Sequence, residues 1–144
     1  MAAWSRQGRF GTKGEGHDPD QRGHEDRGGA RTYVAAWNEP DAEARRRAVA
    51  GLWTEDGAYT DPLAAVQGHE AIAAVIEGAR EMFPGHVFEF AGKVDAHHDV
   101  VRFGWELVPE GGGEATVVGF DVAVVAEDGR LRSVYGFLDK VPVA

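Results

Sequence analysis

The chain has 144 residues, of which 43% are hydrophobic, and this length is typical of one globular domain with a single core. Its formal net charge of −9 argues against nucleic acid as a partner, because that affinity depends largely on Lys and Arg side chains that neutralise phosphates. The sequence contains no cysteine, which excludes disulfides, thiolate metal ligands and cysteine nucleophiles together. No apolar run approaches the ~20 residues of a membrane helix and no signal peptide is recognisable, so we expect no membrane contact and a cytoplasmic location.

The first 31 residues differ in composition from the rest of the chain. They mix glycine with both signs of charge and contain little apolar surface, so the entropy lost on ordering them would go uncompensated. We therefore predict a disordered N-terminal tail over residues 1–31 and one folded domain over residues 32–144.

Three helices and a short strand are predicted in the first part of this domain. The stretch "TYVAAWN" is a short apolar helix, and Pro40 with Asp41 marks the start of a second one. The stretch "AYTD" is a short strand that Pro62 ends, since proline cannot donate to a strand ladder. A third helix with one apolar stripe is predicted over about 68–83.

The second half of the domain changes to the periodicity of strands. Residues 86–94, 99–108, 115–126 and 131–139 alternate or run apolar, and the turn sequences "EGGGE" and "EDGR" separate the last three. This order predicts an antiparallel meander with the helices packed on one face, which is an α+β architecture.

Several chemistries lack their usual sequence signatures. The glycines of "EGGGE" have no following Gly-Lys-Ser/Thr and lie between strands, so a phosphate-binding loop is not predicted. His97 and His98 are adjacent and point to opposite faces of a strand, and no set of spaced metal ligands occurs elsewhere. We therefore expect neither a metal nor another cofactor.

Asp121 is the most informative polar residue, because it lies inside an apolar strand, "ATVVGFDVAVVAEDGR". A buried ionised carboxylate is costly, so Asp121 has either a structural hydrogen-bond partner or a role that needs a neutral acid. Tyr59 and Asp61 point to one face of their strand, and Asp61 either closes that strand or acts as a base. Tyr33 could join both aspartates in one polar cluster, because a buried tyrosine needs a partner for its hydroxyl.

The chain resembles the nuclear transport factor 2-like superfamily, in particular its SnoaL-like polyketide cyclase and ketosteroid isomerase branches. The motifs that carry the resemblance are "YVAAWNEPD", "LWTEDGAYTDP", "GHEAI" and "GFDVAVVAEDGRLRSVYGFLD", in this order, and it covers residues 32–140. The resemblance implies an α+β fold in which a cone-shaped, curved antiparallel sheet wraps around about three N-terminal helices. It also implies an apolar pocket and a homodimer formed through the outer face of the sheet.

The resemblance to ketosteroid isomerases implies a role for three residues. Asp61 matches the general base, while Tyr33 and a protonated Asp121 match the two donors that stabilise the enolate oxygen, an arrangement known from those isomerases. Such an arrangement can move a proton to or from carbon without a cofactor. The expected pocket lining around a small apolar molecule is Tyr59, His69, Phe103, Trp105, Val134, Gly136 and Leu138.

These observations favour a cofactor-independent acid–base enzyme, an isomerase or polyketide-type cyclase, that acts on a small apolar carbonyl compound. A non-catalytic module of the same fold, for ligand binding or dimerisation, is the alternative. A third reading is an epoxide hydrolase or dehydratase-like lyase. The hydrolases use an Asp-Arg-Asp relay, and alternation places the candidate Arg102 on the face opposite Phe103 and Trp105.

Overall fold

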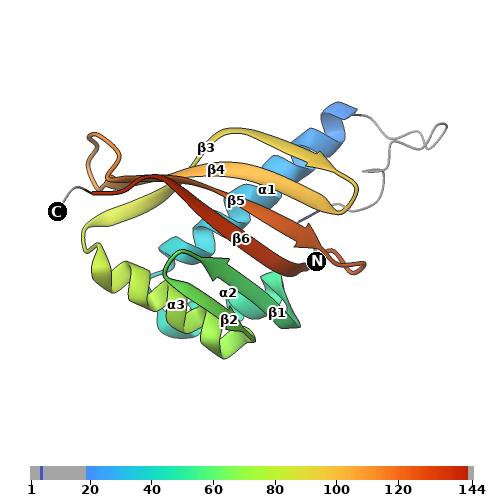
Figure 1. Cartoon of the computed structure of the whole chain (residues 1–144), viewed down its shortest axis with the longest axis horizontal. Helices are drawn as coiled ribbons and strands as arrows, with labels where there is room; N and C mark the ends of the chain where they lie inside the picture. Colours follow the sequence, from blue (N-terminus) through green and yellow to red (C-terminus); the bar gives the residue numbers. More distant parts are fainter. Residues whose placement is uncertain (1–3, 5–18, 143–144) are drawn as a thin grey trace.

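The computed structural model describes Trp4 and residues 19–142, with side chains from residue 25 onward, and consists of three helices against a curved six-stranded sheet (Figure 1). The remaining N-terminal residues of the expected tail lie outside the described residues. The elements in chain order are α1 (Pro19–Asn38), α2 (Ala42–Leu52), β1 (Trp53–Asp61), β2 (Ala64–Gln67), α3 (His69–Met82), β3 (His86–His97), β4 (Val100–Pro109), β5 (Val117–Val125) and β6 (Leu131–Lys140).

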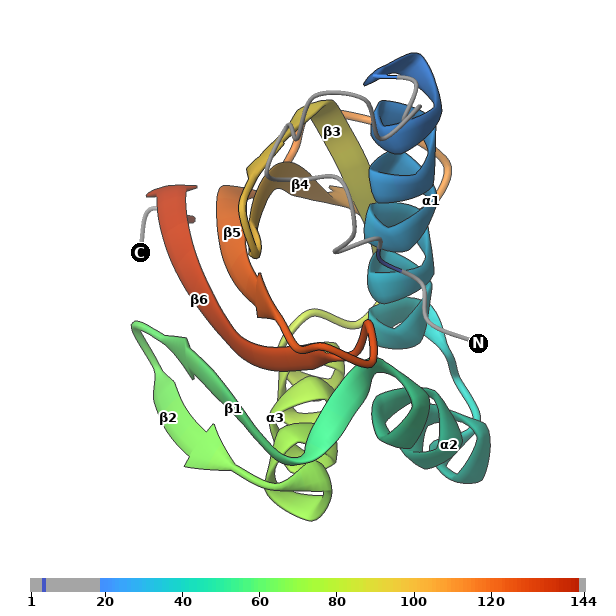
Figure 2. The same cartoon turned by 90° about the vertical axis from the view of Figure 1, so that its right-hand side faces the viewer.

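The strands form one sheet in the order β2-β1-β6-β5-β4-β3, which confirms the α+β class and the expected meander from β3 to β6. All neighbouring strands pair antiparallel except β1 and β6, which run parallel with Tyr59 opposite Val134. Figure 2 shows the strands curving around an interior that α1 closes on one side. Strand β2 was not expected, because its four residues are too few to give a periodic signal.

Helix α1 begins at Pro19, so the expected tail boundary at residue 31 needs correction for residues 19–31. Glycine disfavours helix within this stretch, but tertiary packing overrides that preference. Ala30 is fully buried, and the guanidinium of Arg31 lies 5.1 Å from the ring centroid of Phe90 on β3. The helix therefore extends back along the sheet because the sheet covers one of its faces.

The other two helices begin where the sequence predicts. The carboxylate of Asp41 accepts a hydrogen bond from the amide of Ala44 at 2.8 Å, which is an N-cap that satisfies a free donor of α2. Helix α3 follows Gly68, whose φ of 95° suits a residue without Cβ, and its apolar stripe buries Ile72 and Ile76 completely. Both helices thus contribute their apolar faces to one core.

The end of α1 is fixed to the sheet by Asn38. Its amide nitrogen donates to the carbonyl of Phe88 at 2.7 Å, and its amide oxygen accepts from the Phe88 N–H at 2.8 Å. This pair of bonds holds the last turn of α1 against β3. Trp37, the preceding residue, consequently packs edge-on against the Phe88 ring, with centroids 5.3 Å apart.

Candidate functional site

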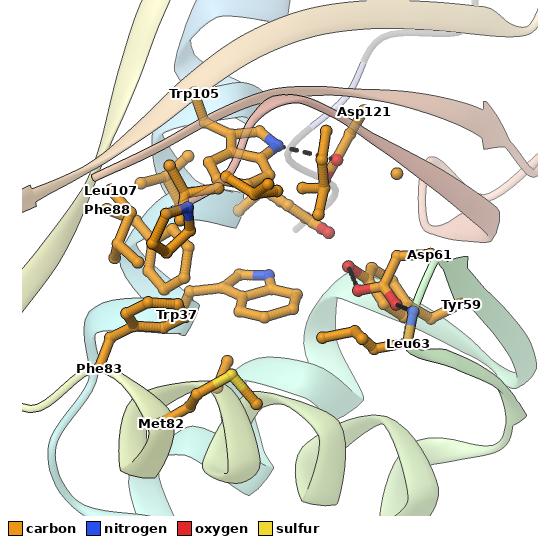
Figure 3. A pocket seen from close by; sticks show the side chains of 18 residues that line it. Trp37, Tyr59, Asp61, Leu63, Met82, Phe83, Phe88, Trp105, Leu107 and Asp121 are labelled. Atoms are coloured by element: carbon orange, nitrogen blue, oxygen red, sulfur yellow. Dashed lines mark hydrogen bonds between the residues drawn. The ribbon is translucent and has the colours of Figure 1, made fainter. Parts of the chain in front are cut away.

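A cavity of about 300 Å³ lies between α1, the β1–β2 hairpin, α3 and the inner face of the sheet (Figure 3). The residues that bring polar atoms to its lining are Tyr33, Trp37, Tyr59, Asp61, Trp105 and Asp121. The rest of the lining is Val34, Leu63, Ala79, Met82, Phe83, Phe88, Leu107, Val117, Gly136, Leu138, Val141 and Pro142. The cavity is therefore an apolar chamber with two carboxyl groups in its wall.

The opening of the cavity is also apolar. Three of its lining side chains, Leu63, Met82 and Val141, belong to the exposed large hydrophobic residues of the protein. They come from the β1–β2 turn, the last residue of α3 and the segment after β6. An apolar molecule that enters the cavity would cover these side chains, and their burial would make its free energy of binding more favourable.

Asp61 is held by the turn that it begins. Its Oδ1 accepts hydrogen bonds from the amides of Leu63 and Ala64 at 2.8 and 2.9 Å, and its Oδ2 accepts one from the Tyr59 hydroxyl at 2.8 Å. Asp at the first and Pro at the second position is a typical β-turn signature, here joining β1 to β2. The three donors stabilise a carboxylate in a fixed orientation.

Asp121 lies in a different environment, in the middle of β5 and only 3% exposed. Its Oδ1 accepts a hydrogen bond from the indole nitrogen of Trp105 on β4 at 2.9 Å. Burial raises the pKa of Asp121 to about 6, with a smaller contribution from the nearby charge of Asp61, while the Trp105 hydrogen bond and the nearby Tyr33 hydroxyl oppose this shift. Asp121 can therefore take up or release a proton near neutral pH.

The two aspartates meet across Gly136 on β6. A Cβ atom at Gly136 would lie 3.1 Å from Asp121 Oδ1, 3.3 Å from Asp61 Cβ and 3.4 Å from the Tyr59 hydroxyl. The first two distances are tighter than most Cβ contacts, so a methyl group here would have to displace the aspartates by a few tenths of an ångström, and a larger side chain would fill the space between the three groups. The absence of a side chain at this position thus keeps both aspartates open to one cavity.

A second glycine allows the contact between Trp105 and Asp121. Gly119 lies opposite Trp105 in the β4–β5 register, and a Cβ there would lie 2.6 Å from the Trp105 ring and 2.5 Å from the carbonyl oxygen of Phe137. The indole therefore lies across the strand over Gly119, and its N–H reaches Asp121 two residues farther along β5.

Both tyrosines of the cavity are held in the neutral form. Burial raises the pKa of Tyr33 well above its usual value, and the charge of Asp121 adds to this effect. Burial also raises the pKa of Tyr59, with further contributions from the charges of Asp121 and Asp61. The Tyr59 hydroxyl donates to Asp61, whereas the buried Tyr33 hydroxyl has no hydrogen-bond partner among the described residues. Asp121 and the Trp37 indole lie near this hydroxyl and influence its pKa, but neither is close enough and well enough aligned to be its hydrogen-bond partner.

Of the residues expected at the site from the sequence, Tyr33, Asp61 and Asp121 all line the same cavity. Four of the expected pocket residues also line it, namely Tyr59, Trp105, Gly136 and Leu138.

The other three expected pocket residues, His69, Phe103 and Val134, do not line the cavity. The imidazole Nε2 of His69 donates to the carbonyls of Trp53 and Thr54, both at 2.9 Å, and so fixes the start of α3 to β1. Phe103 and Val134 point to the inner face, as alternation predicts, but are fully packed in the core. Phe103 stacks on Trp4, with ring centroids 5.6 Å apart.

The sequence analysis did not select several lining residues, among them Trp37, Phe88, Leu107 and Val117. The position of Trp37, one helical turn after Tyr33, could have indicated it, because residues four apart share a helix face. Leu107 and Val117 share a strand face with Trp105 and Asp121 and could have been found by alternation. The residues at the opening, such as Met82, carry no such signal.

Two further observations limit the chemistry of the described part of the chain. Its His, Asp and Glu side chains form no group of three or more that could hold a metal ion. Arg102 lies over the ring of Phe120 at 4.6 Å and is not among the cavity residues, so an Asp-Arg-Asp relay would lack its arginine there.

None of the described helices is long and apolar enough to span a membrane.

The chain belongs to the SnoaL-like domain family, whose model matches residues 30–134. This assignment agrees with the curved sheet, the three helices and the cavity enclosed by them. None of the curated proteins in the comparison matches the chain.

Solved structures give the same assignment. A SnoaL-like protein from Agrobacterium tumefaciens, for which an isomerase activity has been suggested, is 45% identical with a TM-score of 0.72 and covers 76% of this chain and 93% of its own. A protein from Sinorhizobium meliloti with a suggested polyketide cyclase activity is 18% identical (TM-score 0.58; 73% of this chain, 89% of its own). A Nostoc punctiforme protein of unknown function is 15% identical (TM-score 0.61; 80% and 89%). The last two support the fold alone.

Proposed function

We propose that this protein is a cofactor-independent enzyme that transfers protons on a small apolar carbonyl compound, as an isomerase or a polyketide-type cyclase. One observation carries the proposal: two carboxyl groups in different environments, one of them with a raised pKa, converge on a single apolar cavity beside a buried tyrosine hydroxyl that makes no hydrogen bond with another described residue. The suggested isomerase activity of the Agrobacterium relative, at 45% identity, agrees with it.

In the proposed reaction, Asp61 removes a proton from the carbon next to the substrate carbonyl. The three hydrogen bonds to Asp61 support this role, because they stabilise its ionised form and fix its direction. Negative charge then develops on the carbonyl oxygen, where the Tyr33 hydroxyl and a protonated Asp121 donate to it. The raised pKa of Asp121 supports this second role, since a carboxyl group must carry its proton in order to donate.

The proposal is tested with β,γ-unsaturated ketones of several ring sizes. The purified protein should convert at least one of them to the conjugated enone, which is followed by the rise in enone absorbance. Activity should fall as the pH increases through about 6, because ionised Asp121 cannot donate a hydrogen bond. If none of these ketones is converted faster than in buffer alone, the proposed enzymatic activity is contradicted.

A second candidate is a non-catalytic module that binds a small apolar ligand. The observation that favours it is the turn at Asp61, whose Oδ1 is used entirely by two backbone amides and thus has a structural reason to be there. This candidate predicts that apolar ligands bind equally well to the wild type and to Asp61→Asn, with no turnover in either. Turnover that Asp61→Asn abolishes would reject it.

We also propose that the protein forms a homodimer through the outer face of the sheet and that it acts in the cytoplasm. The stacked rings of Phe120 and Phe137, 5.0 Å apart, and the exposed Tyr135 lie on neighbouring strands and support such a contact. Light scattering should give the mass of two chains, and Phe137→Lys should give one. A monomer in the wild type at micromolar concentration would contradict the dimer.

A further inference from the structure

The indole N–H of Trp37 is a buried donor that makes no hydrogen bond within the described part of the chain. Trp37 is 7% exposed and lines the cavity, and its nitrogen has no hydrogen-bond partner among the described residues. Buried polar groups nearly always have a partner, and an unpaired one costs free energy. In Figure 3 the nitrogen lies on the edge of the Trp37 ring that is turned toward Asp121 and away from Met82.

The other three tryptophans differ from Trp37 either in their hydrogen bonding or in their position. The indole of Trp53 donates to the Ala58 carbonyl at 3.3 Å, and that of Trp105 donates to Asp121 at 2.9 Å. The Trp4 indole likewise has no partner among the residues that the structure describes, but it stacks on Phe103 in the core and is not a cavity residue. Trp37 is therefore the tryptophan that both lines the cavity and has an indole N–H without a hydrogen bond to another described residue.

The second unused donor of the cavity comes from the same face of the same helix. Tyr33 lies one helical turn before Trp37, and the centroids of their rings are 6.3 Å apart. Neither group makes a hydrogen bond with another described residue, and both face the same chamber. The Tyr33 hydroxyl lies near Asp121 and the Trp37 indole, whose influence is felt in its pKa, so the two donors form a polar corner that an oxygen of a ligand can complete.

We propose that Trp37 Nε1–H donates a hydrogen bond to an oxygen of the ligand, beside the Tyr33 hydroxyl, and so selects neutral, flat, apolar ketones. The two aspartates in the wall disfavour a ligand with a negative charge of its own, such as a carboxylic acid. The rings of Trp37, Phe88 and Trp105 pack edge to face with centroids 5.3 and 5.6 Å apart, and they give the wall aromatic faces and edges against which the ring of a ligand can pack. Trp37 is thus a specificity-determining residue.

This inference rests on the proposed ligand site but not on turnover. It concerns how the ligand oxygen is bound, which can be measured whether or not the ligand reacts. Its failure can therefore be told apart from the failure of the proposed reaction.

The experiment compares 2-tetralone, which has one acceptor oxygen, with tetralin, which has the same ring system and none. The chain has four tryptophans, so the ¹H–¹⁵N spectrum should hold four indole signals, each assigned by a Trp→Phe variant. We expect 2-tetralone to move the Trp37 indole proton downfield and to slow its exchange with water. Tetralin should not do so, and the signal of Trp53, whose donor is already used, should stay in place with both probes.

Affinity provides the second measurement. Trp37→Phe should weaken 2-tetralone binding roughly three- to tenfold, the size expected for one net hydrogen bond, and leave tetralin binding unchanged. Equal losses for both probes, or an unmoved Trp37 signal in the wild type on saturation with 2-tetralone, would overturn the inference. Failure of both probes to bind would overturn it as well. Binding of 2-tetralone with the expected shift but no turnover of any ketone would uphold it and reject only the proposed reaction.

Discussion

The two carboxyl groups of the cavity are held in opposite ways. Asp61 lies at the turn between β1 and β2, half-buried, and accepts three hydrogen bonds, two of them from amides within three residues of itself. Asp121 lies in the middle of β5, almost fully buried, with one indole donor from another strand. Local chain geometry therefore sets the state of Asp61, whereas burial by distant parts of the chain sets that of Asp121. Similar side chains thereby acquire different chemistry.

The largest expected effect separates the two groups by activity. Asp61→Asn should lower the rate of ketone isomerisation about 10³-fold, because an amide cannot accept the proton. Asp121→Asn should lower it only about tenfold, since an amide still donates a hydrogen bond to the developing oxyanion. Both are measured as enone formation under single-turnover conditions. Equal losses in the two variants would contradict this division of roles.

The pH dependence of stability should come from Asp121. Its pKa is about 6 in the folded protein against 3.8 for the ordinary side chain, so the folded state binds this proton more tightly than the unfolded state. The resulting stabilisation is complete below pH 4 and is lost as the pH rises to about 6, in total about 3 kcal/mol.

The measurement is the free energy of unfolding in urea at several pH values, for the wild type and for Asp121→Asn. The difference between them isolates Asp121 from the other carboxyl groups. The free energy of unfolding of Asp121→Asn should increase relative to that of the wild type from pH 4 to about pH 6, and the difference should then stay constant. A difference that does not vary with pH would mean that the environment of Asp121 does not favour its neutral form.

Gly119→Ala should disturb the Asp121 side of the cavity and leave the Asp61 turn intact. The new Cβ would lie 2.5 Å from the carbonyl oxygen of Phe137 and 2.6 Å from the Trp105 ring, so the indole must move away from Asp121. We expect a loss of about 2 kcal/mol in the free energy of unfolding, typical of overpacking. Gly78→Ala is the matched control, because a Cβ there meets nothing within 4 Å. Equal stability of the two variants would contradict the proposed fit of Trp105.

The smallest expected effect concerns the Asp61 turn. Asp61→Ala removes the acceptor of two backbone amides and should cost about 1 kcal/mol of stability. Asp61→Asn keeps an oxygen acceptor and should remain near the wild type. Chemical denaturation of both variants separates the structural role of Asp61 from its charge. A loss as large for Asn as for Ala would assign the stabilisation to the charge.

The sequence predicted the parts of the site that depend on local periodicity. It placed Tyr59 and Asp61 on one strand face and selected Asp121 and Tyr33 as polar residues of apolar elements, and the resemblance then gave them roles; all four line the cavity. The prediction that Phe103 and Val134 line the cavity was wrong, because alternation indicates which face of the sheet a side chain is on but not whether that part of the face borders the cavity or the packed core. The sequence also failed for α1, whose first turns contain glycine and depend on packing against β3.

By itself, the sequence determined the order of helices and strands, the turn at Asp61 and the faces from which the site residues project. These features follow from helix and strand periods, turn chemistry and proline, all of which act over a few neighbouring residues. Tertiary structure alone decided that Asp121 has a raised pKa and that the Trp37 and Tyr33 donors face the cavity without a hydrogen bond to any other described residue. Burial and missing partners depend on elements far apart in the chain, which meet only when the sheet curves around the helices.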